Sequence, residues 1–307
     1  DGNFNFQSEV AQPLSPRFML SATALVCMAA VRPAGAAPRA SIRMGSPNDL
    51  LIIGTGTLGT LAARQWLDAY PDARVVGETR STKRHDELRA AGVEVRTKGS
   101  AQSDVFPNVL ICFSPGVNLD FPAEVRGALE MWNGSGGCVF TSSGGVFAED
   151  DGGVVSEDSP TSDSERSARM LAAERFVLEA GASVLRLAGL YTDERGAHNF
   201  WLSQEKVDQW GGGLINLLHY EDAASGSLAA LKAKLGPRVL LLGDDVPLTR
   251  SQIVDAALKS SLYAGMKAPI FTKDSGAMGK RYDTALTRSL IDWEPKYPDF
   301  DAFMTRT

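Results

Sequence analysis

The amino-acid sequence predicts an α/β protein with a doubly wound parallel sheet and a smaller C-terminal region. Short apolar segments alternate with helical patterns from Asp49 onward, and a glycine-rich turn follows the first of them. After Gly189 the alternation becomes less regular. Because strands that alternate with helices form βαβ units, we expect a parallel sheet. We therefore divide the chain into residues 1–48, 49–190 and 191–307.

The expected elements follow one another regularly up to residue 190. Apolar runs predict strands, and apolar positions three or four residues apart predict helices. The expected strands are Leu50–Ile53, Arg74–Gly77, Val93–Arg96, Asn108–Phe113, Gly137–Thr141 and Ser183–Leu187. Helices are expected after the glycine-rich turn and at Lys83–Ala91, Phe121–Asn133 and Glu165–Ala180. The acidic, glycine-rich stretch Glu149–Ser164 is expected to be a surface loop.

Fewer elements can be predicted in the C-terminal region. Strands are expected at Leu214–Leu218 and Arg238–Leu242, and helices at Ala223–Lys232 and Ser251–Lys259. Thr249 or Ser251 is a suitable N-cap for the last of these helices. We expect this smaller α/β region to complete the fold and to select a small-molecule substrate.

The composition is that of an ordinary globular protein, with 44% hydrophobic and 22% charged residues among 307. A formal net charge of −6 argues against a general nucleic-acid binder. The histidines and cysteines lack metal-ligand spacing, so we expect no metal site. Cys112 and Cys138 fall in apolar strands, where a thiol is usually a packing residue.

Residues 1–48 have the composition of a targeting segment. From Ala11 to Asn48 there is no Asp or Glu, although the stretch contains several arginines, which is typical of an organellar transit peptide. The apolar run Phe18–Val31 is too short to span a bilayer, so no stable membrane insertion is expected. We expect a plastid address. The alternatives are the mitochondrion, the secretory pathway and a disordered tail without targeting meaning.

The turn after the first strand reads Gly54-Thr55-Gly56-Thr57-Leu58-Gly59, a GxGxxG pattern. It follows an apolar strand and opens a helix, the context of a dinucleotide-binding loop. Gly54 permits a tight turn, Gly56 lets the backbone approach a pyrophosphate, and Gly59 lets the helix pack against the sheet. Backbone N–H groups at the helix N-terminus, where Thr57 and Leu58 lie, then face the phosphates. We therefore expect a Rossmann-type domain that binds a nicotinamide dinucleotide.

The end of the second strand decides between NAD and NADP. Glu78 lies 19 residues after Gly59, close to the spacing of an acid that binds the adenosine ribose, and this favours NAD. Thr79, Arg80 and Ser81 follow, and a guanidinium at Arg80 would pair with a 2′-phosphate. We expect NADP, with NAD as the alternative. For Arg80 the alternative role is a solvated helix start.

Several segments together resemble one protein family. They are Gly54–Gly59, Thr79–Ser81, Phe140–Phe147, Val184–Tyr191, Asn216 with His219, Glu221 and Asp222, and Trp293–Pro298. From about Asp49 to Phe303 the chain resembles the short-chain dehydrogenase/reductase superfamily in its extended form, the NAD-dependent epimerase/dehydratase family. In such a fold Phe113, Ser114 and Pro115 should lie along the cofactor. The alternative for this segment is a Pro-Gly turn without a ligand.

The resemblance implies a catalytic Ser or Thr after the fifth strand and a Tyr-x-x-x-Lys pair on the next helix. Ser143 stands at the first position, but Arg166 and Met170 stand where Tyr and Lys are expected. Arginine cannot shuttle a proton near neutral pH, and methionine cannot stabilise a phenolate. The usual acid/base is therefore missing.

Four side chains are candidates for the remaining chemistry. Tyr191 and His219 are candidate substitutes for the missing pair. The alternatives are a packing aromatic for Tyr191 and a structural histidine, satisfied by the following acidic loop, for His219. Ser142 and Ser143 either face the nicotinamide and substrate or bond the backbone of their own turn.

Two functions remain open. One is an NAD(P)-dependent oxidoreductase or epimerase that acts on a sugar nucleotide or another small carbonyl compound. The other is an NADP-binding redox sensor or assembly factor without turnover. The resemblance also implies a homodimer, because extended members of the family often dimerise. Cofactor binding is the firmer prediction, since the glycine loop is intact and the Tyr-Lys pair is not.

Overall fold

The structure, a computed structural model, describes residues 45–100, 104–116 and 120–306. The expected targeting segment lies outside the described residues, apart from its last four positions. Among the helices of these ranges, none combines the length and the apolar character needed to cross a bilayer.

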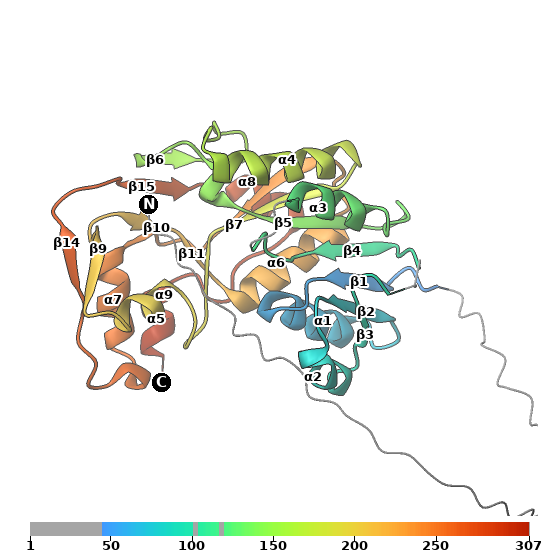
Figure 1. The fold of residues 1–307 in the computed structure, drawn as a ribbon, viewed down its shortest axis with the longest axis horizontal. Helices are drawn as coiled ribbons and strands as arrows, with labels where there is room; N and C mark the ends of the chain where they lie inside the picture. Colours follow the sequence, from blue (N-terminus) through green and yellow to red (C-terminus); the bar gives the residue numbers. More distant parts are fainter. Residues whose placement is uncertain (1–44, 101–103, 117–119, 307) are drawn as a thin grey trace, which may run out of the picture. The chain divides into compact units, whose positions relative to one another are not determined.

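A parallel sheet of seven strands forms the centre of the fold (Figure 1). Its strand order is β12-β7-β5-β4-β1-β2-β3. The bounds are β1 Leu50–Ile53, β2 Val75–Thr79, β3 Glu94–Thr97, β4 Asn108–Ile111, β5 Cys138–Ser143, β7 Ser183–Leu187 and β12 Arg238–Leu242. In register, Ile52 of β1 lies between Gly77 of β2 and Leu110 of β4. The predicted doubly wound parallel sheet is confirmed.

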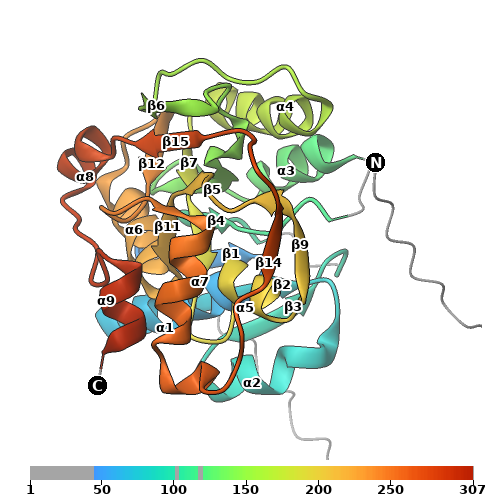
Figure 2. The ribbon, with the colours of Figure 1, turned by 90° about the vertical axis from the view of Figure 1, so that its left-hand side faces the viewer.

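Helices cover both faces of the sheet (Figures 1 and 2). Side chains alternate along a strand, so β1 sends Leu50 and Ile52 into one core cluster and Leu51 and Ile53 into the other. The first cluster is closed by α1 (Thr57–Ala69) and α6 (Tyr220–Ala233), and the second by α3 (Phe121–Leu129) and α4 (Glu165–Glu179). Strands that are buried on both faces must be apolar throughout, which is why β1 reads Leu-Leu-Ile-Ile.

The sheet changes winding direction between β1 and β4. The chain leaves β1 through α1 on one face and leaves β4 through α3 on the other. At such a switch point the connections diverge, and a crevice opens beyond the carboxyl ends of the strands. The ends of β1 and β4 are therefore the place where a ligand is expected.

The chain after β7 builds a third core around Tyr191, Trp201, Ile253 and Phe300. Strand β12 also comes from this part of the chain, but it pairs with β7 in the central sheet.

The remaining elements are α2 His85–Ala90, β6 Asp151–Val155, β8 Gly189–Tyr191, α5 Ala197–Leu202, β9 Lys206–Trp210, β10 Leu214–Ile215, β11 Leu217–His219, β13 Leu248–Thr249, α7 Arg250–Leu258, β14 Ile270–Lys273, β15 Gly279–Tyr282, α8 Ala285–Ile291 and α9 Phe300–Thr305. Thr249 and Gln252 form a capping box at the start of α7, so Thr249 is the cap.

The structure corrects several expected elements. The expected strand Leu214–Leu218 is two short strands, β10 and β11, which pair with β13 and β8. The segment Glu149–Ser164 is not only a loop, because it contains β6, which pairs in parallel with β15. The sequence of β6 is Asp-Gly-Gly-Val-Val, which has no apolar alternation, and its partner is more than a hundred residues later. The fourth strand also ends at Ile111, two residues before Phe113.

Candidate functional site

The glycine loop connects β1 to α1, and its three glycines have different surroundings. Gly54 has φ +102°, and a Cβ added there would lie 2.6 Å from the backbone nitrogen of Phe113. A Cβ on Gly59 would lie 2.5 Å from the carbonyl oxygen of Gly54. A Cβ on Gly56 would meet nothing within 4 Å. Gly54 and Gly59 are therefore required by the fold itself, whereas Gly56 keeps open the space above the loop.

A cleft of about 580 Å³ opens over this loop, and we call it the glycine-loop cleft. It contains all but one of the residues that the sequence predicted for the cofactor. Those lining it are Gly54, Gly56, Thr57, Leu58, Thr79, Arg80, Ser81, Phe113, Ser114 and Pro115. The remaining one, Gly59, is buried under the loop. Ser142, Ser143 and Met170 line the same cleft, so the catalytic side of the predicted site meets the cofactor side.

A second cavity, of about 620 Å³, adjoins the first beside α3. The two cavities share Gly54, Thr79, Arg80 and Phe113. Together they extend across the carboxyl ends of the sheet from β3 to β7, the place expected from the switch point. An elongated ligand, with one end in each cavity, fits this arrangement better than a compact ligand does.

The glycine-loop cleft is lined by Arg80, Arg84 and Arg195, and none of its lining residues is Asp or Glu among the described ones. Arg84 donates to the carbonyl oxygen of Thr55 at 3.0 Å, and Arg195 donates to the hydroxyl of Thr57 at 3.3 Å. The cleft therefore favours an anionic ligand. Arg84 and Arg195 are not among the site residues that the sequence predicts. Arg195 lies 138 residues from Thr57, so no local pattern could have indicated it. Among the described residues, no group of His, Cys, Asp and Glu is arranged to hold a metal ion.

The acidic residue at the end of β2 is already paired. Glu78 is buried, and its carboxylate accepts a hydrogen bond from Arg96 Nε at 2.9 Å. Arg80, by contrast, is half exposed and reaches Glu124 Oε2 of α3 at 3.1 Å, and Lys98 pairs with the same carboxylate. The guanidinium, and not the Glu78 carboxylate, is the charged group that β2 presents to the glycine-loop cleft.

The two serines after β5 have hydrogen-bonded roles. The Ser142 hydroxyl is buried and donates to Glu174 at 2.5 Å, and Glu174 also accepts from Arg186 at 2.8 Å. Ser142 is therefore part of a structural network, and its predicted catalytic role is not supported. The Ser143 hydroxyl accepts the Gly145 N–H at 3.1 Å, which leaves its own proton free to donate into the cleft.

Helix α4 carries both of the substituted catalytic positions. Met170, at the expected lysine position, lines the glycine-loop cleft with its apolar side chain. Arg166, at the expected tyrosine position, is exposed and is not part of the cleft lining. Neither side chain supplies an acid/base to the cleft.

Tyr191 and His219 do not reach the glycine-loop cleft, which corrects their predicted catalytic role. Tyr191 is fully buried, packs edge-on against Phe300 and Phe303, and burial raises the pKa of its phenol. His219 packs against Phe303 and Tyr297 and caps α6 by accepting the Glu221 N–H at its Nδ1. The neighbouring Tyr220 lines the cleft instead. Both predicted residues are packing groups of the third core.

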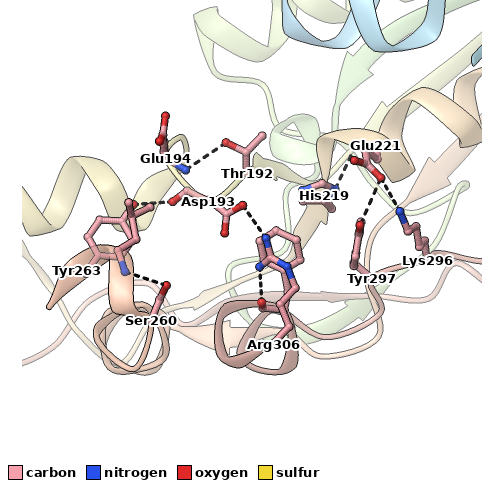
Figure 3. A network of polar contacts seen from close by, with 12 residues as sticks. Thr192, Asp193, Glu194, His219, Glu221, Ser260, Tyr263, Lys296, Tyr297 and Arg306 are labelled. Carbon is pink, nitrogen blue, oxygen red and sulfur yellow. Dashed lines mark hydrogen bonds and ion pairs between the residues drawn. The ribbon is translucent and has the colours of Figure 1, made fainter. Parts of the chain in front are cut away.

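The cap at His219 predicts a pH-dependent stability (Figure 3). Burial lowers the pKa of His219 to about 4, and a neutral Nδ1 is required to accept the Glu221 N–H. The unfolded chain takes up a proton near pH 6.5 while the folded chain does not, so stability falls as the pH drops from about 6.5 toward 4. We expect a loss of about 2 kcal/mol between pH 7 and pH 5 in urea unfolding. His219→Asn, which keeps a capping acceptor, should lose correspondingly less; equal losses would contradict the assignment.

No protein-family model matches the sequence, and no curated protein matches it at a significant level. The fold, however, has solved counterparts. A conserved protein of unknown function from Silicibacter pomeroyi is 21% identical, with a TM-score of 0.66 over 83% of this chain and 96% of its own. UDP-glucuronic acid 4-epimerase from Bacillus cereus, solved with NAD, is 17% identical, with a TM-score of 0.68 over 84% and 94%. dTDP-glucose 4,6-dehydratase from Bacillus anthracis, also solved with NAD, is 14% identical, with a TM-score of 0.68 over 84% and 94%.

These neighbours define the class of fold. Two of them are a sugar-nucleotide epimerase and a sugar-nucleotide dehydratase, and all three matches extend over more than nine-tenths of the neighbour's chain. The predicted resemblance to extended short-chain dehydrogenase/reductase proteins is therefore confirmed at the level of the fold.

Proposed function

We propose that this chain is an NADP-binding protein of the extended short-chain dehydrogenase/reductase type, with the dinucleotide held in the glycine-loop cleft. The observation that carries the proposal is the lining of that cleft by Arg80, Arg84 and Arg195 without any carboxylate among its described residues. A pyrophosphate fits such a lining, and the open space at Gly56 lets phosphates approach the N-terminus of α1. The adjoining cavity at the adenosine end is lined by Arg80 and Lys98 together with the acids Glu78, Asp120 and Glu124.

The preference for NADP over NAD rests on β2. Glu78, at the spacing of a ribose-binding acid, lines the second cavity, but its side chain is buried and its charge is already paired with Arg96. Arg80 stands at the edge of both cavities, where its planar guanidinium suits a phosphate. Its contact with Glu124 orients the side chain and leaves further N–H donors for a ligand.

Arg80→Ala is expected to weaken NADP binding by about tenfold to hundredfold, because a charge-assisted bidentate contact is lost. NAD, which lacks the 2′-phosphate, should lose little affinity. Isothermal titration calorimetry with both cofactors measures the difference. Arg89→Ala, in an exposed arginine of α2 paired with Asp86, is the matched control and should bind both cofactors normally. Equal losses for NADP and NAD would remove Arg80 from the 2′-phosphate role.

For the chemistry, binding without the usual proton transfer is the function that the cleft supports best. Met170 and Arg166 supply no acid/base, and Tyr191 and His219 lie in the third core. Such a protein would act as a redox sensor or an assembly factor. A second candidate, an oxidoreductase or epimerase on a sugar nucleotide or small carbonyl compound, is favoured by the hydroxyl groups of Ser143 and Tyr220 along the cleft.

One experiment separates the two candidates. NADPH and NADP⁺ binding is measured first, and carbonyl compounds and sugar nucleotides are then screened for a change in nicotinamide absorbance. Tight binding without turnover supports the sensor. Turnover that is lost in Ser143→Ala or Tyr220→Phe, with binding retained, supports the enzyme. Failure to bind either cofactor would overturn the proposal as a whole.

A further inference from the structure

We infer that Arg195 is a pyrophosphate-binding residue, supplied to the glycine-loop cleft by the C-terminal part of the chain; this rests on the proposed dinucleotide function. Arg195 follows β8 and lines the cleft beside the loop. Its Nη1 donates to the hydroxyl of Thr57, the first residue of α1, at 3.3 Å. The guanidinium therefore stands at the helix terminus toward which phosphates are drawn.

The guanidinium of Arg195 is suited to an anion. It lies 5.6 Å from the centre of the Tyr220 ring, which also lines the cleft, so the ring offers it a cation–π contact. A guanidinium has five N–H donors, and one bond to the Thr57 hydroxyl leaves most of them for a ligand. Since the described lining of the cleft contains no carboxylate, a phosphate oxygen entering there meets no competing anion.

The turn that carries Arg195 is held in place from several sides (Figure 3). The Thr192 N–H donates to the Arg195 carbonyl at 2.8 Å, which closes the turn. The carbonyl of Asp193 accepts from the Tyr263 hydroxyl at 2.6 Å, and its carboxylate pairs with Arg306 at 2.6 Å. Tyr263 of the third core and Arg306 after α9 thus hold the turn that carries Arg195, so the side chain is presented to the loop before a ligand arrives.

Position along the cleft separates Arg195 from the other arginines. Arg80 stands at the end of β2 and borders both cavities, which assigns it to the adenosine end. Arg84 also lines the cleft, but its guanidinium is engaged by the carbonyl of Thr55 and by Glu87. Arg195 borders only the cavity over Thr57. The pyrophosphate, which NAD and NADP share, is therefore the group that Arg195 binds.

The test compares Arg195→Gln and Arg195→Lys with the wild type and with the Arg89→Ala control. Titrations use NADP⁺, NAD⁺ and adenosine 2′-monophosphate, which has no pyrophosphate. Arg195→Gln should weaken NADP⁺ and NAD⁺ binding by the same factor, about tenfold or more. It should leave adenosine 2′-monophosphate binding unchanged. Arg195→Lys should recover part of the loss because it retains the charge. Thermal unfolding checks that both variants remain folded.

The outcomes are distinct. Unchanged NADP⁺ affinity in Arg195→Gln overturns the inference and leaves the proposed function intact. A loss of affinity confined to NADP⁺ and adenosine 2′-monophosphate also overturns the inference, because Arg195 would then bind the 2′-phosphate. If wild-type protein binds neither dinucleotide, the proposed function fails and this inference fails with it.

Discussion

Gly56→Ala is expected to reduce affinity for both NADP and NAD by about a hundredfold, or ~2.7 kcal/mol, while the protein stays folded. The added Cβ meets no protein atom within 4 Å, so the loop accepts it. The space it enters is the glycine-loop cleft, where the phosphates must approach the backbone. Calorimetry gives the affinities, and urea unfolding should show a change in stability of less than about 1 kcal/mol.

The other two glycines provide the contrast. Gly54→Ala places a Cβ 2.6 Å from the Phe113 backbone in a residue with positive φ, and Gly59→Ala places one 2.5 Å from the Gly54 carbonyl. Both should destabilise the protein itself, because backbone and not a flexible side chain must move. If Gly56→Ala stays folded and binds both cofactors normally, the glycine-loop cleft is not a phosphate site. If the variant unfolds, Gly56 is required by the fold as Gly54 and Gly59 are.

The parts of the site that could be predicted are those encoded locally. The glycine loop is a short segment between a strand and a helix, so its three glycines carry their roles in their spacing. Arg80 could be predicted because β2 ends beside it. The parallel sheet could be predicted because apolar strands alternate with helices along the chain. This alternation is still recognisable when the predicted bounds of an element are wrong by one or two residues.

The parts that could not be predicted depend on contacts between distant segments. Arg195 meets Thr57 across 138 residues, and β6 meets β15 from opposite ends of the C-terminal half. Tyr191 and His219 are the last residues of strands β8 and β11, where family position suggested a site. Their rings instead turn into the third core, because that core offers Phe300 and Phe303 as packing partners. Tertiary packing sets the direction of a side chain at the end of a strand, and a single sequence does not reveal that packing.

Glu174→Ala should be among the most destabilising single substitutions in the described chain. Glu174 and Arg186 are both more than nine-tenths buried and paired at 2.8 Å, and Ser142 donates to the same carboxylate. Removing the carboxylate leaves a buried guanidinium without its counter-charge, which costs about 3 to 5 kcal/mol. Arg186 retains its stacking on Phe147 and its bond to the Glu157 carbonyl, neither of which supplies a negative charge. Urea unfolding measures the loss.

The controls for Glu174→Ala separate burial from charge pairing. Lys259→Ala breaks an exposed pair with Asp301 and should cost less than about 1 kcal/mol. Ser142→Ala removes one hydroxyl and leaves the ion pair, so a loss of about 1 to 2 kcal/mol is expected, with NADP affinity unchanged. A large loss of cofactor binding or turnover in Ser142→Ala, at full stability, would return Ser142 to the catalytic role that the sequence first suggested. If Ser142→Ala loses stability but keeps its affinity for NADP, the buried network serves to fix the end of β5. Ser143 is then the hydroxyl of this turn that can act on a ligand in the cleft.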